Sequence, residues 1–413
     1  MDVILERCAG LDVHQATVAV AVRLPGPGKA RTQLIQTFGT TTPDLLTLRD
    51  WLSAHGVTHF ALESTGVYWK SVYYLLEDAF TVLLVNASHM KNVPGRKTDV
   101  QDCAWIAQLL EHGLLRGSFV PPPPIHELRD LTRYRKALIQ DRTREANRLH
   151  KVLEDAGIKL ATVATDVLGV SGRAMLAALV GGTTDPAVLA ELARGRLRAK
   201  LPALRQALTG RFRARHAFLI AQILAHLDYL EETIATLSAE IAAQLAPFVA
   251  AVTRLRTIPG VDQRTAEVVV AEIGVDMSRF PTANHVVSWA GLCPGNSESA
   301  GKRHRGTTRK GCKWLRATLS EAALGAIRKK DCVLGARYRR IMRRRGHKIA
   351  VVAIARTLLE IAYLLLARET TYQELGADFF DRRDKERATH RYVRLLQQLG
   401  HHVTLESTTP IVA

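Results

Sequence analysis

The sequence predicts an α/β amino-terminal domain, a helical, coiled-coil middle and a mainly α carboxy-terminal domain. In residues 3–120, three strand-like runs (CAGLDVH, TVAVAVRL and TQLIQTFG) precede alternating strand and helix patterns. Beyond the four prolines at 121–124, long helical periodicities take over. From Arg254 a hairpin-like segment leads into a loop rich in glycine and basic residues. We therefore expect domains at 1–120, 121–250 and 251–370, with a charged tail at 371–413.

The elements of the first domain follow one another in the order of a ribonuclease-H-like fold. After the three strands we expect a helix over 43–55, the strand HFALES, an amphipathic helix in YWKSVYYLLEDAF, the strand TVLLVN and a helix over about 99–112. Such a fold places acidic residues at strand ends and on its last helix. The first domain is therefore where we look for a nuclease-type acidic site.

Four acidic residues occur at these places. Asp12 lies in an apolar strand, where a carboxylate needs a partner or a metal. Glu63 ends another apolar run, and Asp99 and Asp102 are spaced i, i+3, which puts both on one face of a helix. Divalent cations relieve the repulsion among converging carboxylates and stabilise the attacking and leaving oxygens of a phosphodiester. We predict a Mg²⁺ or Mn²⁺ site at Asp12, Glu63, Asp99 and Asp102, with Arg96 and Lys97 steering phosphate; for each acid alone, a surface or capping role is the alternative.

Charge and apolar patterning restrict the class of protein. The 413 residues carry a formal charge of +18, which indicates a polyanionic partner such as nucleic acid. Five widely spaced cysteines without a CxxC pair indicate a reducing compartment. No run matches a signal peptide, and the most apolar stretch, 349–367, is interrupted by Arg356 and Glu360. We expect a soluble, cytoplasmic protein in which this stretch is a buried helix, too broken to span a membrane.

The helical middle contains a heptad-like seam. Its members, which step by four and three residues, are Ile223, Leu227, Leu230, Ile234, Leu237 and Ile241. Such a seam packs against the chain's own helix at 126–155 or against a second subunit, and the sequence does not choose between the two.

The stretch IPGVDQRTAEVVVAEIG resembles one helix-hairpin-helix element, with Pro259 and Gly260 as the tight hairpin. A hairpin of this kind presents main-chain N–H groups at the start of a helix, where phosphate binds. Gly260 is therefore a candidate contact to nucleic acid. Asp262 stands where a second glycine is usual, and a plain helical turn is the alternative.

The segment GLCPGNSESAGKRHRGTTRKGCKWLR combines glycines, cations and hydroxyl groups, which suits a loop that approaches phosphate. Ser299 is the candidate nucleophile and Ser297 the second choice. No His/Asp triad is readable, so activation would come from metal ions or nearby cations. A further basic segment, ARYRRIMRRRGHK, suits a nucleic-acid backbone, with a solvated helix face as the alternative. The cations assigned to nucleic-acid binding are Lys302, Arg303, Arg305, Arg309, Lys310, Lys313, Arg316, Arg343, Arg344 and Arg345.

Taken together, the motifs resemble the DEDD-type insertion-sequence transposases that carry a catalytic serine, a family of bridge-RNA-guided recombinases. The match runs nearly end to end, through GLDVHQ, ALESTGVYW, the KTDxxDCxxIAxLL helix, IPGV, the AGLCP…GKRHRG…RKGCKWLR block and YQELGADFFDRRDKER. The resemblance implies a RuvC-like domain joined by a coiled coil to a transposase domain. It also implies that the four acids bind the metal.

The resemblance further implies a serine nucleophile that forms a 5′-phosphoserine link to DNA. Counted from Pro294, Ser299 matches that serine, although the family usually has glycine directly after it and here Ala300 precedes Gly301. Implied partners are double-stranded DNA at the element ends and target, a guide RNA, and further copies of the chain in a dimer or tetramer. The rival readings are a junction endonuclease that uses water and a catalytically inactive nucleic-acid-binding relic.

Overall fold

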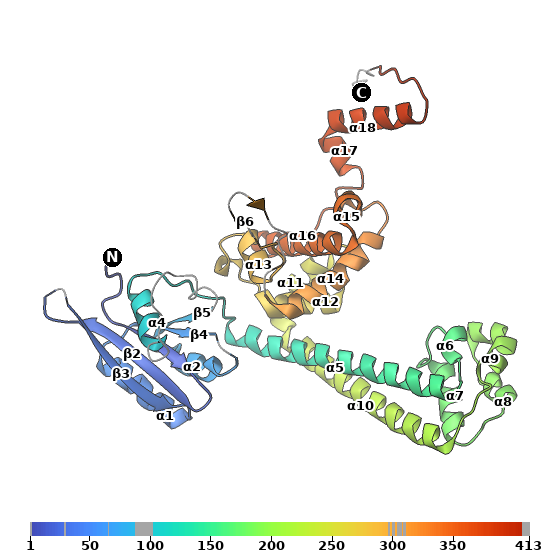
Figure 1. Cartoon of the computed structure of the whole chain (residues 1–413), viewed down its shortest axis with the longest axis horizontal. Coiled ribbons are helices and arrows are strands. Elements are labelled where there is room, and N and C mark those ends of the chain that lie inside the picture. The colour runs from blue at the N-terminus through green and yellow to red at the C-terminus, as the bar shows by residue number, and fades with distance from the viewer. Residues whose placement is uncertain are drawn as a thin grey trace. The chain divides into compact units, whose positions relative to one another are not determined.

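The computed structural model describes residues 2–28, 30–64, 66–86, 102–295, 298–299, 302–303, 308 and 311–406. The chain divides into two compact units between Val120 and Pro121. Figure 1 shows the elements of each unit. The further divisions expected at residues 250 and 370 remain predictions.

The first unit is a five-stranded mixed sheet in the order β3-β2-β1-β4-β5. The central strand β1 pairs antiparallel with β2 and parallel with β4, while β3 and β5 extend the two halves. This arrangement confirms the expected α/β class and is compatible with a ribonuclease-H-like domain. The strands are β1 Cys8–Val13, β2 Thr17–Pro25, β3 Arg31–Gly39, β4 His59–Glu63 and β5 Thr81–Val85.

Alternate residues of β1 enter two different cores, because successive side chains of a strand point to opposite faces. Leu11 and its neighbours two positions away pack with helices α1 (Thr42–Ala54) and α2 (Trp69–Leu76). Cys8 packs on the opposite side with helix α4 (Asp102–Glu111). The sheet is therefore covered on both faces, and α4 covers the face that also carries Gly10.

Helix α4 lies so close to β1 that position 10 has no room for a side chain. A Cβ atom on Gly10 would lie 2.2 Å from the carbonyl oxygen of Cys103 and 2.3 Å from the amide nitrogen of Ala107. Both are main-chain atoms, so no rotamer change relieves the overlap. This contact places the start of α4 against the strand that carries Asp12.

The far end of α4 is held by a buried carboxylate. Glu111 is fully buried and receives the Nε–H groups of Arg23 at 2.8 Å and Arg31 at 2.5 Å. These arginines come from β2 and β3, so the ion pairs join the helix to the antiparallel half of the sheet. Burial, with a contribution from the charge of Glu111, raises the pKa of the neighbouring Cys8 thiol to about 12.

Two long helices, α5 (Pro123–Asp155) and α10 (Ala214–Gln244), pack along each other in the second unit (Figure 1). Leu138 of α5 is buried with Leu230 and Ile234 of α10. The heptad seam therefore packs against the chain's own helix, one of the two arrangements that the sequence left open.

A group of short helices lies between α5 and α10 in the sequence and packs at the end of the pair (Figure 1). They share one hydrophobic core with the last turns of α5 and the first turns of α10, including Leu149, Leu176, Leu204 and Ile220. We call residues 156–213 the tip lobe. Its elements are α6 Leu160–Val163, α7 Val170–Val180, α8 Pro186–Glu191, the 3-10 helix η2 Gly195–Lys200 and α9 Leu201–Ala207.

Among the remaining helices, α16 (His347–Arg368) contacts α11, α13, α14 and α15. By length and composition alone α16 is apolar enough to cross a membrane, contrary to the expectation that Arg356 and Glu360 make it too broken; 56% of its most apolar window is buried in the unit, as a buried helix requires. The other elements are η3 Ala246–Phe248, α11 Val249–Arg256, α12 Gln263–Ile273, η4 Met277–Arg279, α13 Ala283–Trp289, α14 Lys313–Arg328, α15 Val333–Arg345, α17 Phe379–Arg383 and α18 Lys385–Gln398.

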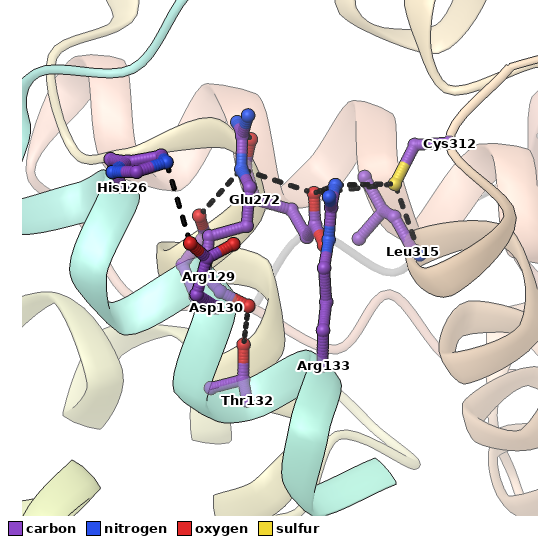
Figure 2. A network of polar contacts seen from close by, with 9 residues as sticks. His126, Arg129, Asp130, Thr132, Arg133, Glu272, Cys312 and Leu315 are labelled. Atoms are coloured by element: carbon purple, nitrogen blue, oxygen red, sulfur yellow. Dashed lines mark hydrogen bonds and ion pairs between the residues drawn. The ribbon is translucent and has the colours of Figure 1, made fainter. Parts of the chain in front are cut away.

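A network of buried ion pairs joins α5 to α12 (Figure 2). The carboxylate of Glu272 is fully buried and accepts two hydrogen bonds from Arg133, at 2.7 and 2.8 Å. Arg129 donates to the main-chain oxygens of Ala271 and Glu272, at 3.3 and 2.5 Å. The two-point geometry between a guanidinium and a carboxylate fixes direction as well as distance. The start of α5 is thus held to the end of α12.

The same network reaches the residue before α14. The Cys312 thiol donates to Glu272 at 3.2 Å and accepts the main-chain N–H of Leu315 at 3.5 Å, so Cys312 caps the helix (Figure 2). Burial raises the pKa of Cys312 to about 11, and the charge of Glu272 contributes to the rise. The thiol therefore keeps its proton at neutral pH, and Glu272 connects α5, α12 and the start of α14.

Gly10→Ala should destabilise the first unit, because the added methyl group meets the main chain of α4. Overpacking of this kind costs about 1–3 kcal/mol of unfolding free energy. Gly117→Ala is the matched control, since the nearest atom to its Cβ would be a side-chain carbon of Leu83 at 3.8 Å. Urea unfolding compares the two variants. Equal losses in both would contradict the close packing of α4 on β1.

Glu272→Gln should lower the free energy of unfolding strongly, because the buried Arg129 and the half-buried Arg133 then lose their charged partner. Breaking a buried ion pair costs about 3–5 kcal/mol. Glu321→Gln is the control, since it removes the exposed partner of Lys136, 2.8 Å away, and exposed pairs contribute about 0–1 kcal/mol. Thermal unfolding measures both. The importance of the network is refuted if the control loses as much as Glu272→Gln.

Candidate active site and nucleic-acid interface

Asp12 and Glu63 occupy equivalent places on neighbouring strands. β1 and β4 run parallel with Leu11 opposite Leu62, so Asp12 and Glu63 follow in the same register. Adjacent strands lie about 4.8 Å apart, and residues in register project to the same face. That face is the one against α4, because Asp12 is two residues beyond Gly10. Both side chains are half-buried at the carboxyl ends of the two strands.

Asp102 begins α4 on the same side of the sheet. Its neighbour Cys103 is buried against Ala21 of β2. Burial raises the pKa of the Cys103 thiol, and the negative charges of Asp12 and Asp102 raise it further. Both carboxylates are therefore near enough to act on one thiol. The fold brings Asp12, Glu63 and Asp102 to one face of the sheet, at the end where β1 and β4 finish.

His14 is a residue of this region that sequence reasoning missed. Its Nε2 lies 3.3 Å from a carboxylate oxygen of Asp12, and its side chain is 66% exposed against 27% for Asp12. The pattern Asp-x-His at a strand end is a usable signal, because residues two apart on a strand share a face. An imidazole in this place can bind a metal or hold a proton beside the carboxylate.

The donor set suits a hard divalent cation. Carboxylate oxygens are the ligands that Mg²⁺ prefers, and two of them come from adjacent strands in register. Among the described residues, however, no three His, Cys, Asp or Glu side chains lie close enough together to hold a metal ion. Asp99, Arg96 and Lys97 lie outside the described residues. The chemistry of the donors fits the metal, and the site itself stays a prediction.

The candidate nucleophile lies on a short hairpin. Strand β6 (Glu298–Ser299) pairs antiparallel with β7 (Lys302–Arg303), which puts Ser299 opposite Lys302. A bridge between Pro294 and Thr308 closes the hairpin nearer its base. The main chain of Ser299 is therefore paired with that of a cationic residue. Ser297, Arg305, Arg309 and Lys310 lie outside the described residues.

The two ends of this hairpin are pressed together at their base. A Cβ atom on Gly311 would lie 2.4 Å from the main-chain nitrogen of Gly291, so this position has no room for a side chain. The next residue, Cys312, is bound to Glu272 and through it to Arg133 (Figure 2). The base of the serine hairpin is thus fixed to α5 and α12.

Gly260 lies in the turn between α11 and α12, with a φ of +82°. A Cβ atom there would lie 2.3 Å from the carbonyl oxygen of Ala322 in α14. Asp262 caps α12 by accepting the N–H of Thr265 at 2.8 Å. Although burial acts to raise the pKa of Asp262, its hydrogen bonds with Thr265 lower it overall. Packing and capping account for this turn, and contact of Gly260 with nucleic acid stays a prediction.

Five of the cations predicted to bind nucleic acid lie in described helices. Lys313 is exposed, with its ammonium 5.0 Å from the ring centre of Trp314, and Arg316 is half-buried in α14. Three exposed arginines form the last turn of α15, where cations also favour the helix dipole. In these positions the cations can reach phosphate groups, and their contact with nucleic acid stays a prediction. The three arginines are Arg343, Arg344 and Arg345.

Two family models match the chain. DEDD_Tnp_IS110, described as a transposase, matches residues 9–158, which include the sheet with Asp12, Glu63 and Asp102 and the whole of α5. Transposase IS116/IS110/IS902 family matches residues 252–339, which include the turn at Gly260 and the serine hairpin.

Two curated proteins are similar in sequence. The transposase for insertion sequence element IS1111A of Coxiella burnetii is 26% identical over 297 residues, covering 70% of this chain and 72% of that protein. The insertion element IS110 uncharacterized 43.6 kDa protein of Streptomyces coelicolor is 29% identical over 120 residues, so this chain spans only 29% of its length. Two separate segments of the chain are thus similar to transposase domains, the second to that of the IS116/IS110/IS902 family.

Proposed function

We propose that the chain is a transposase that cuts and rejoins DNA at the ends of an insertion sequence and at its target. The observation that carries the proposal is the register of β1 and β4, which sets Asp12 beside Glu63 on the face against α4, where Asp102 begins the helix. This acidic face lies in the first matched transposase domain, and the Ser299 hairpin lies in the second.

The acidic residues supply the electrostatic part of the reaction. Asp12, Glu63, Asp99 and Asp102 would hold Mg²⁺ or Mn²⁺, which supplies positive charge to the oxygens of the phosphodiester. The main chain of α4, packed on Gly10, keeps Asp102 on the same face as the two strand acids. Arg96 and Lys97 would hold the phosphate backbone in place.

Ser299 supplies the nucleophile. Its Oγ attacks the phosphorus, the bond from phosphorus to the 3′ oxygen breaks, and a 5′-phosphoserine ester and a free 3′-hydroxyl result. After strand exchange, a 3′-hydroxyl attacks the ester, which restores the phosphodiester and releases the serine with its proton. The hairpin base fixed by Gly311 and Cys312 supports this role, because a nucleophile gains rate from a fixed position.

The partners follow from the same proposal. Double-stranded DNA binds the basic surfaces that include Lys313 and the last turn of α15, and a guide RNA pairs with the element end and the target. In a dimer or tetramer, the acidic site of one copy acts on the Ser299 of another. The reaction takes place in the cytoplasm, where the DNA is.

A metal-dependent endonuclease that uses water is the second candidate. It is favoured by the placement of Asp12, Glu63 and Asp102 on one face of the first unit, without a residue from the serine hairpin. The two candidates differ in whether Ser299 becomes covalently attached to DNA.

Wild-type protein incubated with Mg²⁺, guide RNA and labelled element-end DNA should form a protease-sensitive DNA adduct on a denaturing gel. Ser299→Ala and Asp102→Ala should both abolish it, because one removes the nucleophile and the other removes charge at the metal site. Ser297→Ala is the matched control and should leave the adduct unchanged. If DNA is cleaved without an adduct, and Ser299→Ala cleaves as well as the wild type, the chain is the endonuclease that uses water. If the wild type and all variants bind the DNA and none cleaves it, the chain is a catalytically inactive nucleic-acid-binding protein.

Asp12→Asn should weaken Mn²⁺ binding at least about tenfold, because it removes a charged oxygen ligand. Electron paramagnetic resonance of free Mn²⁺ measures this without any reaction. Asp50→Asn is the control, since Asp50 is 70% exposed and its ion-pair partner in the described part of the chain is its neighbour Arg49, at 2.9 Å. Equal binding by both variants would remove Asp12 from the proposed metal site.

A further inference from the structure

We propose that the tip lobe carries a separate nucleic-acid-binding surface, centred on Arg194, Arg196 and Lys200, which contacts the phosphate backbone. These residues lie between the two segments matched by transposase models. The proposal concerns binding alone, so it stands or falls independently of the strand chemistry proposed above.

The first support is an unbalanced run of charge. Residues 192–227 contain eight Lys or Arg and no Asp or Glu. All eight are exposed. Exposed positive charges at this density repel one another and attract polyanions. The eight are Arg194, Arg196, Arg198, Lys200, Arg205, Arg211, Arg213 and Arg215.

Ion pairing divides these cations into two groups. Arg198 and Arg205 share the carboxylate of Glu191, each at 3.3 Å. Within the described chain, by contrast, no carboxylate lies within 4.0 Å of Arg194, Arg196 or Lys200. The positive charge of these three is therefore not offset by a neighbouring acid.

Arg194, Arg196 and Lys200 line one hollow in the tip lobe. Its volume is about 520 Å³, and the side chains of Thr165 and Ser171 line it as well. Arg, Lys, Ser and Thr are the side chains that most often bind phosphate oxygens in nucleic-acid complexes. The single acid of the lining, Asp166, accepts the main-chain N–H of Leu168 at 2.9 Å. The hollow therefore presents cations and hydroxyls together.

The walls of this hollow are anchored to the rest of the lobe. The main-chain N–H of Arg194 donates to Oγ of Ser171 at 2.9 Å, which joins the segment before η2 to α7. The ammonium of Lys200 donates to the carbonyl oxygen of Val163 at 3.2 Å. Beneath them, α7 and α9 share the buried core of the lobe. The cations thus project from a packed scaffold, so little ordering is needed on binding.

The surface is remote from the serine hairpin along the second unit. Helix α5 has 33 residues, which is about 50 Å at a rise of 1.5 Å per residue. Its first turns bear Arg129 and Arg133, which hold the base of the hairpin, and its last turns enter the tip-lobe core. A nucleic acid bound in the hollow therefore meets the protein at a second, distant point.

The test is equilibrium binding by the full chain without divalent metal, over a range of salt concentrations. Arg194→Gln/Arg196→Gln should weaken binding about tenfold or more and reduce the slope of log K against log salt by about 2. Arg198→Gln/Arg205→Gln is the matched control, with the same change of charge on the same lobe but at cations already paired with Glu191. It should change the slope by clearly less.

Two labelled probes distinguish the source of the phosphate backbone. A DNA duplex of about 30 base pairs and an RNA hairpin are titrated separately with each variant. A selective loss with either probe, relative to the control variant, supports the surface and identifies DNA or RNA as its occupant. An equal loss in both variants would mean a general effect of net charge, and no loss in Arg194→Gln/Arg196→Gln would mean a solvated face; each overturns the proposal.

Discussion

The contact between α4 and β1 at Gly10 determines the arrangement of the acidic site. Asp12 and Glu63 are aligned by the parallel register of their strands, which needs only hydrogen bonding in the sheet. Asp102 belongs to a different element, and its position depends on how closely that helix approaches the strand. Main-chain atoms of Cys103 and Ala107 occupy the space that a side chain at position 10 would need. The helix can therefore pack on this face of the sheet in one position. A side chain at residue 10 would displace the first turn, and with it the carboxylate.

In the second unit, as in the first, a close main-chain contact at a glycine and a buried glutamate fix the segment beside a candidate catalytic residue. A close contact between Gly311 and Gly291 closes the base of the serine hairpin. The contact at Gly10 fixes the position of α4 in the same manner. In each unit a fully buried glutamate then receives two arginines: Glu111 in the first and Glu272 in the second. Buried ion pairs add little net stability over apolar packing, but an unpaired member is costly. We infer that these pairs select one placement of the helix or loop beside each candidate catalytic residue.

The sequence was informative wherever the signal is local. The strands, the long helices and the seam of α10 follow from periodicity, and the structure confirms them. Glu111 and Glu272 were not found, because their arginine partners are 80 to 143 residues away and nothing in the local pattern marks a carboxylate as buried. The sequence predicted a buried helix over 349–367, and α16 spans His347–Arg368; Arg356 and Glu360, which were counted as interruptions, pair with each other at 2.8 Å. The roles of the acidic residues and Ser299 rest on chemistry and resemblance, which geometry alone does not test.

Net charge by itself does not locate the nucleic-acid surface. Helix α5 contains many arginines, yet Arg133 and Arg135 are bound to the buried carboxylates of Glu272 and Glu267. An arginine held by a buried carboxylate cannot reach phosphate without breaking that pair, which costs more than a phosphate contact returns. Binding is therefore left to cations that have no acidic partner. On this criterion Arg194 and its neighbours in the tip lobe are better placed than α5, although α5 and residues 192–227 each contain eight Lys or Arg residues.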